Sequence, residues 1–240
     1  MIFLNILVVA GILSHTKTAA DDQPPTRECG GQHVCTTLMK YKDGTVVDEG
    51  DNCYCREGVS SCSKEWDNTH GDNSLTWQHY ERAHWTVQYR FCTNVFQGKK
   101  QCQGDEMAAV VETDIKKWEP LVDEPRCVCG ADVSFKIMGW KRVGNKWKYF
   151  YKCEKEECPR PSTTLTEQSA CARIYIDVNK YTDKVLEVDF LCNCPDGYMC
   201  PTKFDEKADS KKVMQDNTGN YVVKYCDSIM KQKISSLNES

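Results

Sequence analysis

Sixteen cysteines, arranged in a pattern that recurs three times, constrain this chain more than any other feature of its sequence. Each repeat contains a cysteine, a spacer, a Cys-x-Cys pair and, further on, an aromatic β-like run that ends in another cysteine. The opening cysteines and the pairs that follow them are Cys35 with Cys53/Cys55, Cys102 with Cys127/Cys129, and Cys171 with Cys192/Cys194. A fixed order of features recurring along a chain indicates repeated structural units.

The first twenty residues are predicted to be a secretory signal peptide. Residues 2–13 form an apolar run that is too short to span a bilayer comfortably, and small residues at Thr18 and Ala20 suit signal peptidase. The alternative is an N-terminal anchor. No later stretch of the sequence is long and apolar enough to cross a membrane. We therefore expect a secreted, soluble and monomeric protein.

An even number of cysteines in a secreted chain implies disulfide bonds, here up to eight. Zinc binding is the competing interpretation, but zinc sites more often use Cys-x2-Cys spacing, and no histidine lies near the last two Cys-x-Cys pairs. We therefore expect structural disulfides, no metal site and no cofactor. Spacing leaves the pairing open, although most bonds should lie within a repeat because each repeat holds an even number. The cysteines are Cys29, Cys35, Cys53, Cys55, Cys62, Cys92, Cys102, Cys127, Cys129, Cys153, Cys158, Cys171, Cys192, Cys194, Cys200 and Cys226.

The predicted fold is small, disulfide-rich and mainly β, with three tandem disulfide-stapled β-hairpin modules. Small modules with modest cores need covalent staples, and this chain supplies them. Alternating apolar residues around short polar turns favour hairpins, most clearly in residues 173–190 and in residues 135–152 around Val143-Gly144-Asn145. The expected divisions are a polar leader (21–28), a first module with six cysteines (29–95), a second with four (96–153), and a third with six and a polar tail (154–240).

The sequence contains few groups suited to catalysis. It has no Gly-x-Ser-x-Gly elbow and no His-Glu-x-x-His helix, and an even cysteine count leaves no obvious thiol nucleophile. His79 and His84 are the best catalytic candidates, but half-exposed histidines packed among aromatic residues are the favoured interpretation. We expect no enzyme. The formal net charge of −4 also gives no general attraction to nucleic acid.

One segment departs from this acidic balance. Between Val133 and Cys153 lie six lysines or arginines and six aromatic residues, with no acidic residue among them. Such a hairpin is either a solvated lysine face over an aromatic core, or a recognition surface for an anionic, aromatic-lined receptor vestibule. The candidate target-binding residues are Trp140, Lys141, Arg142, Lys146, Trp147, Lys148 and Tyr149.

The cysteine framework resembles that of the family 11 scoloptoxins of centipede venom. The stretch Phe190-Leu-Cys-Asn-Cys-Pro-Asp-Gly-Tyr-Met-Cys200 and the strand pair before it carry most of the resemblance. It implies a secreted toxin that modulates an extracellular target, a voltage-gated ion channel with potassium channels as the leading class. Serial disulfide-bonded hairpins also resemble Argos (giant-lens), a secreted arthropod protein that clamps an EGF-like ligand. That resemblance implies, as the alternative, an antagonist that sequesters a growth-factor-type ligand.

Overall fold

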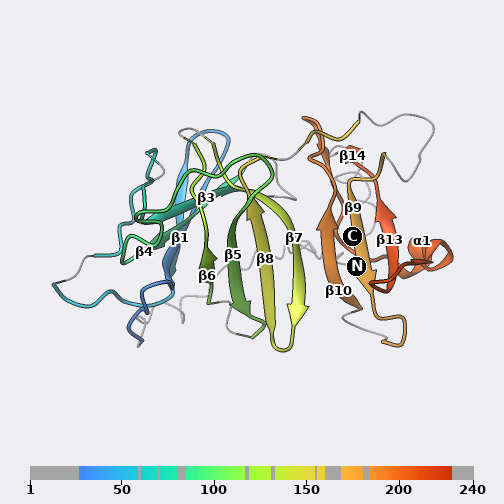
Figure 1. The fold of residues 1–240 in the computed structure, drawn as a ribbon, viewed down its shortest axis with the longest axis horizontal. Coiled ribbons are helices and arrows are strands. Elements are labelled where there is room, and N and C mark those ends of the chain that lie inside the picture. Colours follow the sequence, from blue (N-terminus) through green and yellow to red (C-terminus); the bar gives the residue numbers. More distant parts are fainter. Residues whose placement is uncertain are drawn as a thin grey trace, which may run out of the picture.

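The described part of the chain is built almost entirely of β-strands and loops (Figure 1). A computed structural model describes residues 27–58, 61–69, 71–79, 85–116, 119–130, 133–154, 156–159, 169–180 and 184–228. The predicted signal peptide, most of the leader and the end of the tail lie outside these residues. Among them, α1 (Glu206–Asp209) is the α-helix and is followed by the 3-10 turn η3 (Ser210–Lys212); no helix in these ranges is long and apolar enough to cross a membrane. The predicted mainly β, cysteine-rich fold is confirmed.

The first segment, residues 29–95, forms a four-stranded antiparallel sheet. Its strands are β1 (Val34–Lys40), β2 (Val46–Asp51), β3 (Ser74–Gln78) and β4 (Thr86–Phe91). They lie in the order β2-β1-β4-β3. The hairpin of β1 and β2 therefore meets the hairpin of β3 and β4 through the pairing of β1 with β4.

The second and third segments, residues 96–153 and 154–240, share one eight-stranded sheet. The second segment contributes β5 (Met107–Asp114), β6 (Leu121–Pro125), β7 (Lys136–Val143) and β8 (Lys146–Lys152). The third contributes β9 (Ala172–Ile176), β10 (Val185–Phe190), β12 (Met214–Gln215) and β13 (Asn220–Lys224), while β11 (Tyr198–Met199) and β14 (Asp227–Ser228) form a separate ribbon. The strand order is β12-β13-β9-β10-β7-β8-β5-β6. Within each segment's four strands, the first strand lies beside the fourth and the second and third strands lie at the edges, as in the first sheet.

All sixteen cysteines are paired, and each of the eight disulfides lies within one segment, as the even counts predict. The first segment holds Cys29–Cys53, Cys35–Cys62 and Cys55–Cys92, the second Cys102–Cys127 and Cys129–Cys153, and the third Cys158–Cys192, Cys171–Cys200 and Cys194–Cys226. In both six-cysteine segments the first cysteine therefore bonds to the third, the second to the fifth and the fourth to the sixth. The second segment keeps the first and last of these bonds.

This connectivity corrects the alignment of the repeats. Cys102 corresponds to Cys29 and Cys158, not to Cys35 and Cys171 as its place before the Cys-x-Cys pair indicated. The backbone agrees, because the N–H groups of these three cysteines donate to the carbonyl of the middle residue of each pair: Tyr54 at 2.9 Å, Val128 at 2.9 Å and Asn193 at 2.6 Å.

Ala108 is the residue of the second segment that corresponds to Cys35 and Cys171. The carbonyl oxygens of these three residues each accept the N–H of the residue that precedes a Cys-x-Cys pair, at 2.8–2.9 Å. Ala108 is fully buried, so a small side chain occupies the position at which the other segments have a crosslink.

Strands β7 and β10 join the second and third segments. They pair antiparallel through Lys141 and Glu187, Trp140 and Val188, and Gly139 and Asp189. A Cβ atom at Gly139, where φ is +149°, would lie 2.1 Å from the carbonyl oxygen of Val188. Only glycine allows the two backbones to approach this closely. Because the sheet continues across this joint, the predicted module boundary at residue 153 stays a prediction.

The first segment contacts the second through isolated β-bridges and side-chain packing. His33 forms an antiparallel bridge to Leu121, and Trp77 forms a parallel bridge to Phe135. The ring of Trp77 also packs edge-on against Tyr151, with ring centroids 5.8 Å apart. Trp77, Phe135 and Tyr151 belong to one core cluster that extends through all three segments.

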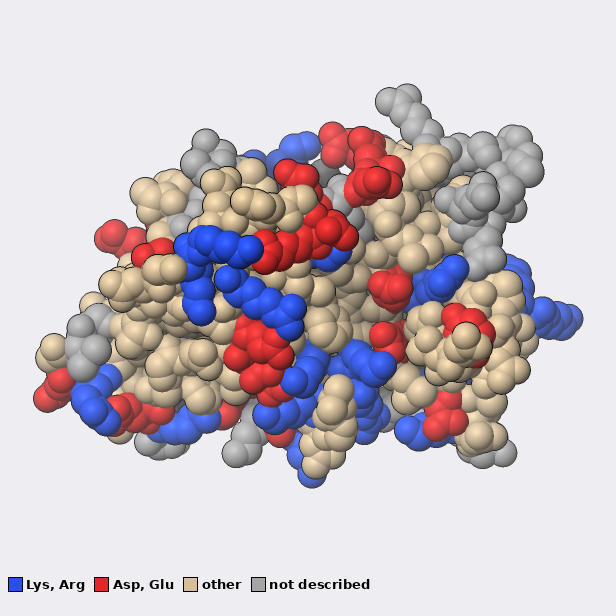
Figure 2. Space-filling model, viewed as in Figure 1, with Lys and Arg blue, Asp and Glu red and all other residues tan. Residues whose placement is uncertain are grey.

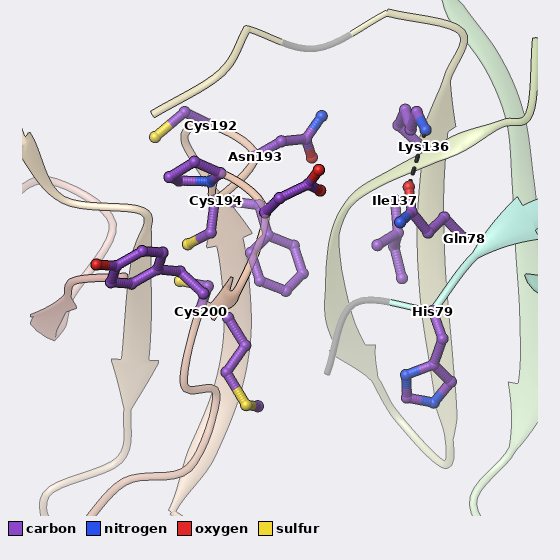
Figure 3. A pocket seen from close by; sticks show the side chains of 13 residues that line it. Gln78, His79, Lys136, Ile137, Cys192, Asn193, Cys194 and Cys200 are labelled. Atoms are coloured by element: carbon purple, nitrogen blue, oxygen red, sulfur yellow. Dashed lines mark hydrogen bonds between the residues drawn. The ribbon is translucent and has the colours of Figure 1, made fainter. Parts of the chain in front are cut away.

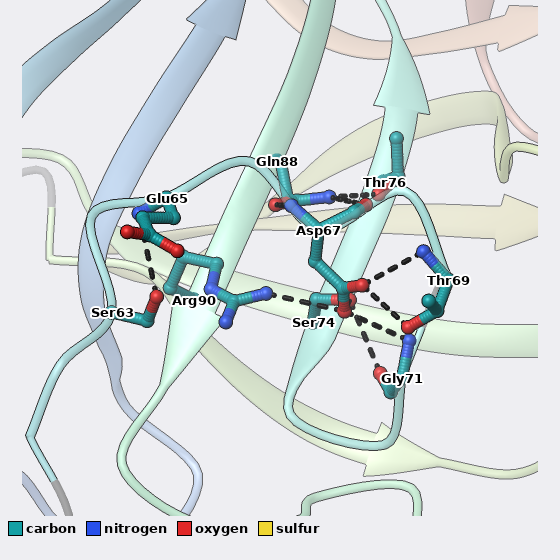
Figure 4. Close-up of polar contacts among 9 residues, drawn as sticks. All are labelled: Ser63, Glu65, Asp67, Thr69, Gly71, Ser74, Thr76, Gln88 and Arg90. Atoms are coloured by element: carbon teal, nitrogen blue, oxygen red, sulfur yellow. Dashed lines mark hydrogen bonds and ion pairs between the residues drawn. The ribbon is translucent and has the colours of Figure 1, made fainter.

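A partly buried carboxylate organises the loop before β3 (Figure 4). Asp67 accepts hydrogen bonds from the backbone N–H groups of Thr69 (2.8 Å) and Gly71 (2.9 Å) and from the hydroxyl of Ser74 (3.0 Å), and it forms an ion pair with Arg90 at 3.3 Å. Burial alone would raise the pKa of Asp67, but the donated hydrogen bonds outweigh it and hold the pKa well below its usual range.

Candidate functional site

The basic aromatic segment forms the predicted hairpin. Strands β7 and β8 pair through Val143 and Lys146, and Gly144 adopts a φ of +61° in the turn between them. Residues directly opposite each other share a face of a sheet. Lys141 and Lys148 therefore lie on one face, whereas two other opposed pairs, Arg142 with Trp147 and Trp140 with Tyr149, lie on the other.

The lysine face, which comprises Lys141, Lys146 and Lys148, meets acidic residues from neighbouring strands. Lys141 lies 2.9 Å from Glu187 of β10. Lys146 and Lys148 each lie 2.6 Å from a carboxylate oxygen of Glu112 of β5, and Lys148 also lies 3.0 Å from Asp123 of β6. In Figure 2, lysine or arginine and acidic side chains lie side by side over the lower ends of β5, β8 and β7. The hairpin is basic in sequence, but its lysine face is balanced by acids from other strands.

Glu112 is the centre of this ion-pair network. Its side chain is only 8% exposed. Burial raises its pKa, but the ammonium groups of Lys146 and Lys148 outweigh this effect and leave the pKa below its ordinary value. The Glu112 and Asp123 carboxylates in turn raise the pKa of Lys148. Removing either lysine would leave the buried Glu112 carboxylate less well compensated.

The opposite face carries the aromatic residues. Trp140 packs against Tyr149 and Phe190, with ring centroids 6.1 Å and 5.5 Å away. Trp140 and Trp147 line an open hollow of about 480 Å³, which we call the aromatic hollow. Its other lining residues are Lys184, Val185, Thr202, Lys203, Phe204 and Glu206 of the third segment.

Arg142 lies beside Trp147 on the face of the aromatic hollow. Its side chain donates a long hydrogen bond of 3.5 Å to the carbonyl of Gly144. No carboxylate in the described part of the chain pairs with it. Of the seven predicted binding residues, Arg142 is thus the cation whose charge is not balanced by a neighbouring strand.

The sequence did not single out the third-segment residues of the aromatic hollow. Lys184 lies 2.6 Å from Glu206, and its ammonium lies 5.6 Å from the centroid of the Phe204 ring. These residues are distant from the hairpin in sequence, and only the pairing of β7 with β10 brings the two segments together. No local pattern could have revealed that pairing.

The histidine candidate that the structure describes is packed among aromatic rings. His79 stacks on Trp77, with ring centroids 5.7 Å apart, and meets Trp85 edge-on at 6.2 Å. This is the environment that the structural interpretation predicted, whereas His84 lies outside the described residues. Groups of three cysteine sulfurs, such as those of Cys29, Cys55 and Cys92, come within 4.8 Å of one another. They belong to neighbouring disulfides, which lack the thiolate that ligates metals.

Comparison with known proteins identifies a toxin relative. No protein-family profile matches the chain. U-scoloptoxin(11)-Sm7a from Scolopendra morsitans is 27% identical over 161 residues, which cover 66% of this chain and 64% of that toxin. The match therefore spans slightly less than two thirds of the relative's length. The predicted resemblance to family 11 scoloptoxins is confirmed.

A structural comparison finds the crystal structure of unliganded Argos. The two chains share 16% sequence identity and a TM-score of 0.40, with 84% of this chain and 91% of that chain covered. The predicted resemblance in architecture is found, but it is too weak to support conclusions about this chain.

Proposed function

We propose that this chain is a secreted venom toxin that binds and modulates an extracellular protein. The similarity to U-scoloptoxin(11)-Sm7a, whose name marks it as a toxin, supports this proposal. So do the eight disulfides, which suit the oxidising environment outside the cell. We take the target to be a voltage-gated ion channel, with potassium channels as the leading class, and the action to be binding rather than catalysis.

The placement of Arg142 beside Trp147 is the observation that supports assigning particular residues to target binding. Arginine and tryptophan are the residue types most enriched where binding energy concentrates. A guanidinium next to an aromatic ring can enter an anionic, aromatic-lined vestibule. We therefore assign target contact to Trp140, Arg142 and Trp147.

The remaining predicted residues have another role in this proposal. Lys141, Lys146 and Lys148 hold carboxylates of neighbouring strands, and Tyr149 packs against Trp140. A target that recruited Lys146 or Lys148 would have to separate it from Glu112, at the cost of leaving that carboxylate less well compensated.

Patch-clamp recording of the purified, oxidised protein on a panel of voltage-gated channels tests the proposal. Arg142→Gln should weaken modulation of the sensitive channel about tenfold or more, as loss of a central arginine contact commonly does. Lys141→Gln is the matched control, because it removes the same charge from the exposed lysine face and breaks a surface ion pair of small energetic value.

Two results would contradict the proposal. Equal loss in both variants would indicate that overall charge, and not the Arg142 contact, drives binding. Absence of modulation across the panel would refute a channel target and favour capture of a growth-factor-type ligand.

A further inference from the structure

A second pocket lies where all three segments meet, and it shares no lining residue with the aromatic hollow. Gln78 and His79 at the end of β3 and Lys136 and Ile137 at the start of β7 form one wall (Figure 3). The disulfide-rich loop 192–200 of the third segment forms the other. The pocket has a volume of about 150 Å³. Since roughly 10–15 Å³ suffices for one water molecule, a group of several heavy atoms fits.

Lys136 is the residue of this pocket whose charge indicates an anionic ligand. Its ammonium donates to the side-chain oxygen of Gln78 at 3.1 Å, and no carboxylate in the described ranges pairs with it. Lys152, which lies directly opposite Lys136 in the register of β7 and β8, instead pairs with Asp105 at 3.5 Å. Burial lowers the pKa of Lys136, as expected for an ammonium without a counter-charge. An ammonium has three donors, and a neutral amide oxygen satisfies one of them.

The other walls define what a ligand for Lys136 can be. Asn193 extends from the opposite wall toward Lys136 and Gln78 (Figure 3), so that wall is polar where it faces the ammonium. Ile137 and Phe190 are buried apolar residues that line the same space. Asp196 lines the pocket from an exposed position, so its charge opposes an anion there and opposes a ligand with two negative charges more strongly than a ligand with one. The lining therefore favours one negative charge attached to a short apolar body.

We propose that this pocket binds a monocarboxylate, with the carboxylate on the Lys136 ammonium and the apolar portion against Ile137 and Phe190. A free organic acid and the acidic side chain of a partner protein both present this chemistry. The site is independent of the aromatic hollow, so it can be tested whether or not the protein modulates a channel.

An NMR titration of the full-length, oxidised and isotope-labelled protein tests the site with two probes. The first is 4-methylpentanoate, with the uncharged 4-methylpentanamide as its control. The second is the blocked peptide N-acetyl-Gly-Glu-Gly-amide. A saturable shift of the Ile137 and Asn193 amides is expected, with a dissociation constant on the order of 1 mM for the better probe. Tighter binding of the free acid would identify a small-molecule site, and tighter binding of the peptide a protein side chain.

Three variants show whether Lys136 is responsible. Lys136→Met should weaken carboxylate binding about tenfold or more, because it removes a hydrogen bond to a charged group. It should not lower the denaturant midpoint of unfolding, because it also removes a partly buried, uncompensated cation. Lys136→Arg should retain binding, and Lys152→Met, on the neighbouring strand, should bind as the native protein does.

The proposal is overturned if neither probe gives saturable shifts at these amides. It is equally overturned if the amide control binds as well as the acid, or if Lys152→Met weakens binding as much as Lys136→Met. If Lys136→Met lowers the denaturant midpoint, its weaker binding could reflect unfolding, and Lys136→Arg decides instead. Loss of carboxylate binding in Lys136→Arg would then overturn the proposal.

Discussion

Gly139→Ala should separate the eight-stranded sheet at the joint between β7 and β10. The added Cβ would lie 2.1 Å from the carbonyl oxygen of Val188, and backbone atoms cannot rotate away as a side chain can. The two strands must therefore move apart at Asp189, the partner of Gly139. Since this joint consists of three residue pairs, a displacement at one end disturbs most of it.

The magnitude follows from two contributions. An alanine held at a φ of +149° costs about 1–3 kcal/mol of backbone strain, because this region is nearly restricted to glycine. Each ladder hydrogen bond lost at the joint removes about 1 kcal/mol. With one or two bonds lost, the free energy of unfolding should fall by about 2–5 kcal/mol.

Gly144→Ala is the matched control. Gly144 lies in the turn of the same hairpin and also has a positive φ, +61°, but no atom lies within 4 Å of its added Cβ. This substitution should cost only about 1–2 kcal/mol for the left-handed conformation. The difference between the two variants reports the close approach of the two backbones, together with any greater strain at the φ of +149°.

Guanidinium unfolding with intact disulfides, followed by tryptophan fluorescence, measures both variants. Hydrogen exchange should in addition show faster exchange at the amides of β10 in Gly139→Ala only. If Gly139→Ala is no more destabilising than Gly144→Ala, or if β10 keeps its protection, β7 and β10 do not pair as described.

Two further predictions concern stability. Asp67→Asn should lower the free energy of unfolding at neutral pH by about 1–3 kcal/mol, since it removes a partly buried, multiply hydrogen-bonded carboxylate. Because the folded-state pKa of Asp67 lies below its unfolded value, this contribution is complete above about pH 4 and is lost as the pH falls through the folded-state pKa. Denaturation curves should therefore show the native protein and the variant converging in acid, and a constant gap would contradict the carboxylate's role. Replacing Cys35 and Cys62 together by serine gives the first segment the two-bond pattern of the second; the protein should still fold, with a stability loss of about 2–4 kcal/mol in the same assay, and failure to fold would show that the pattern is not sufficient there.

Local signals in the sequence predicted the elements but not their assembly. Alternation of apolar residues and the Gly144-Asn145 turn located the hairpin of β7 and β8, because side-chain direction and turn geometry depend on neighbouring residues. Glu187 and Asp189 alternate with apolar residues, which shows that they share a face. That this face lies next to Lys141 depends on the register between β7 and β10, which no local pattern encodes.

The repeat illustrates the same limit. Cysteine order along the chain indicated three repeats, but it matched Cys102 to Cys35. The structure instead matches Cys102 to Cys29, because the Cys102–Cys127 bond corresponds to the Cys29–Cys53 bond. The corresponding bonds span 24 residues for Cys29–Cys53, 25 for Cys102–Cys127 and 34 for Cys158–Cys192, so spacing relates the first two segments to each other but not to the third. The carbonyl that accepts the N–H before each Cys-x-Cys pair identifies Ala108 as the missing position, and such hydrogen bonds are visible only in the folded chain.

The recurring strand order also bears on self-association. Every segment presents its second strand at one edge and its third strand at the other, and the β7–β10 joint pairs one edge of each kind. The same rule would allow further copies to extend the ribbon into a fibre. Here β12, at one end, is only two residues long, and β6, at the other, ends in Pro125 and is bridged by His33 at Leu121. Short, proline-bearing and covered edges are poor templates for another chain, so neither edge of the eight-stranded sheet favours such an extension.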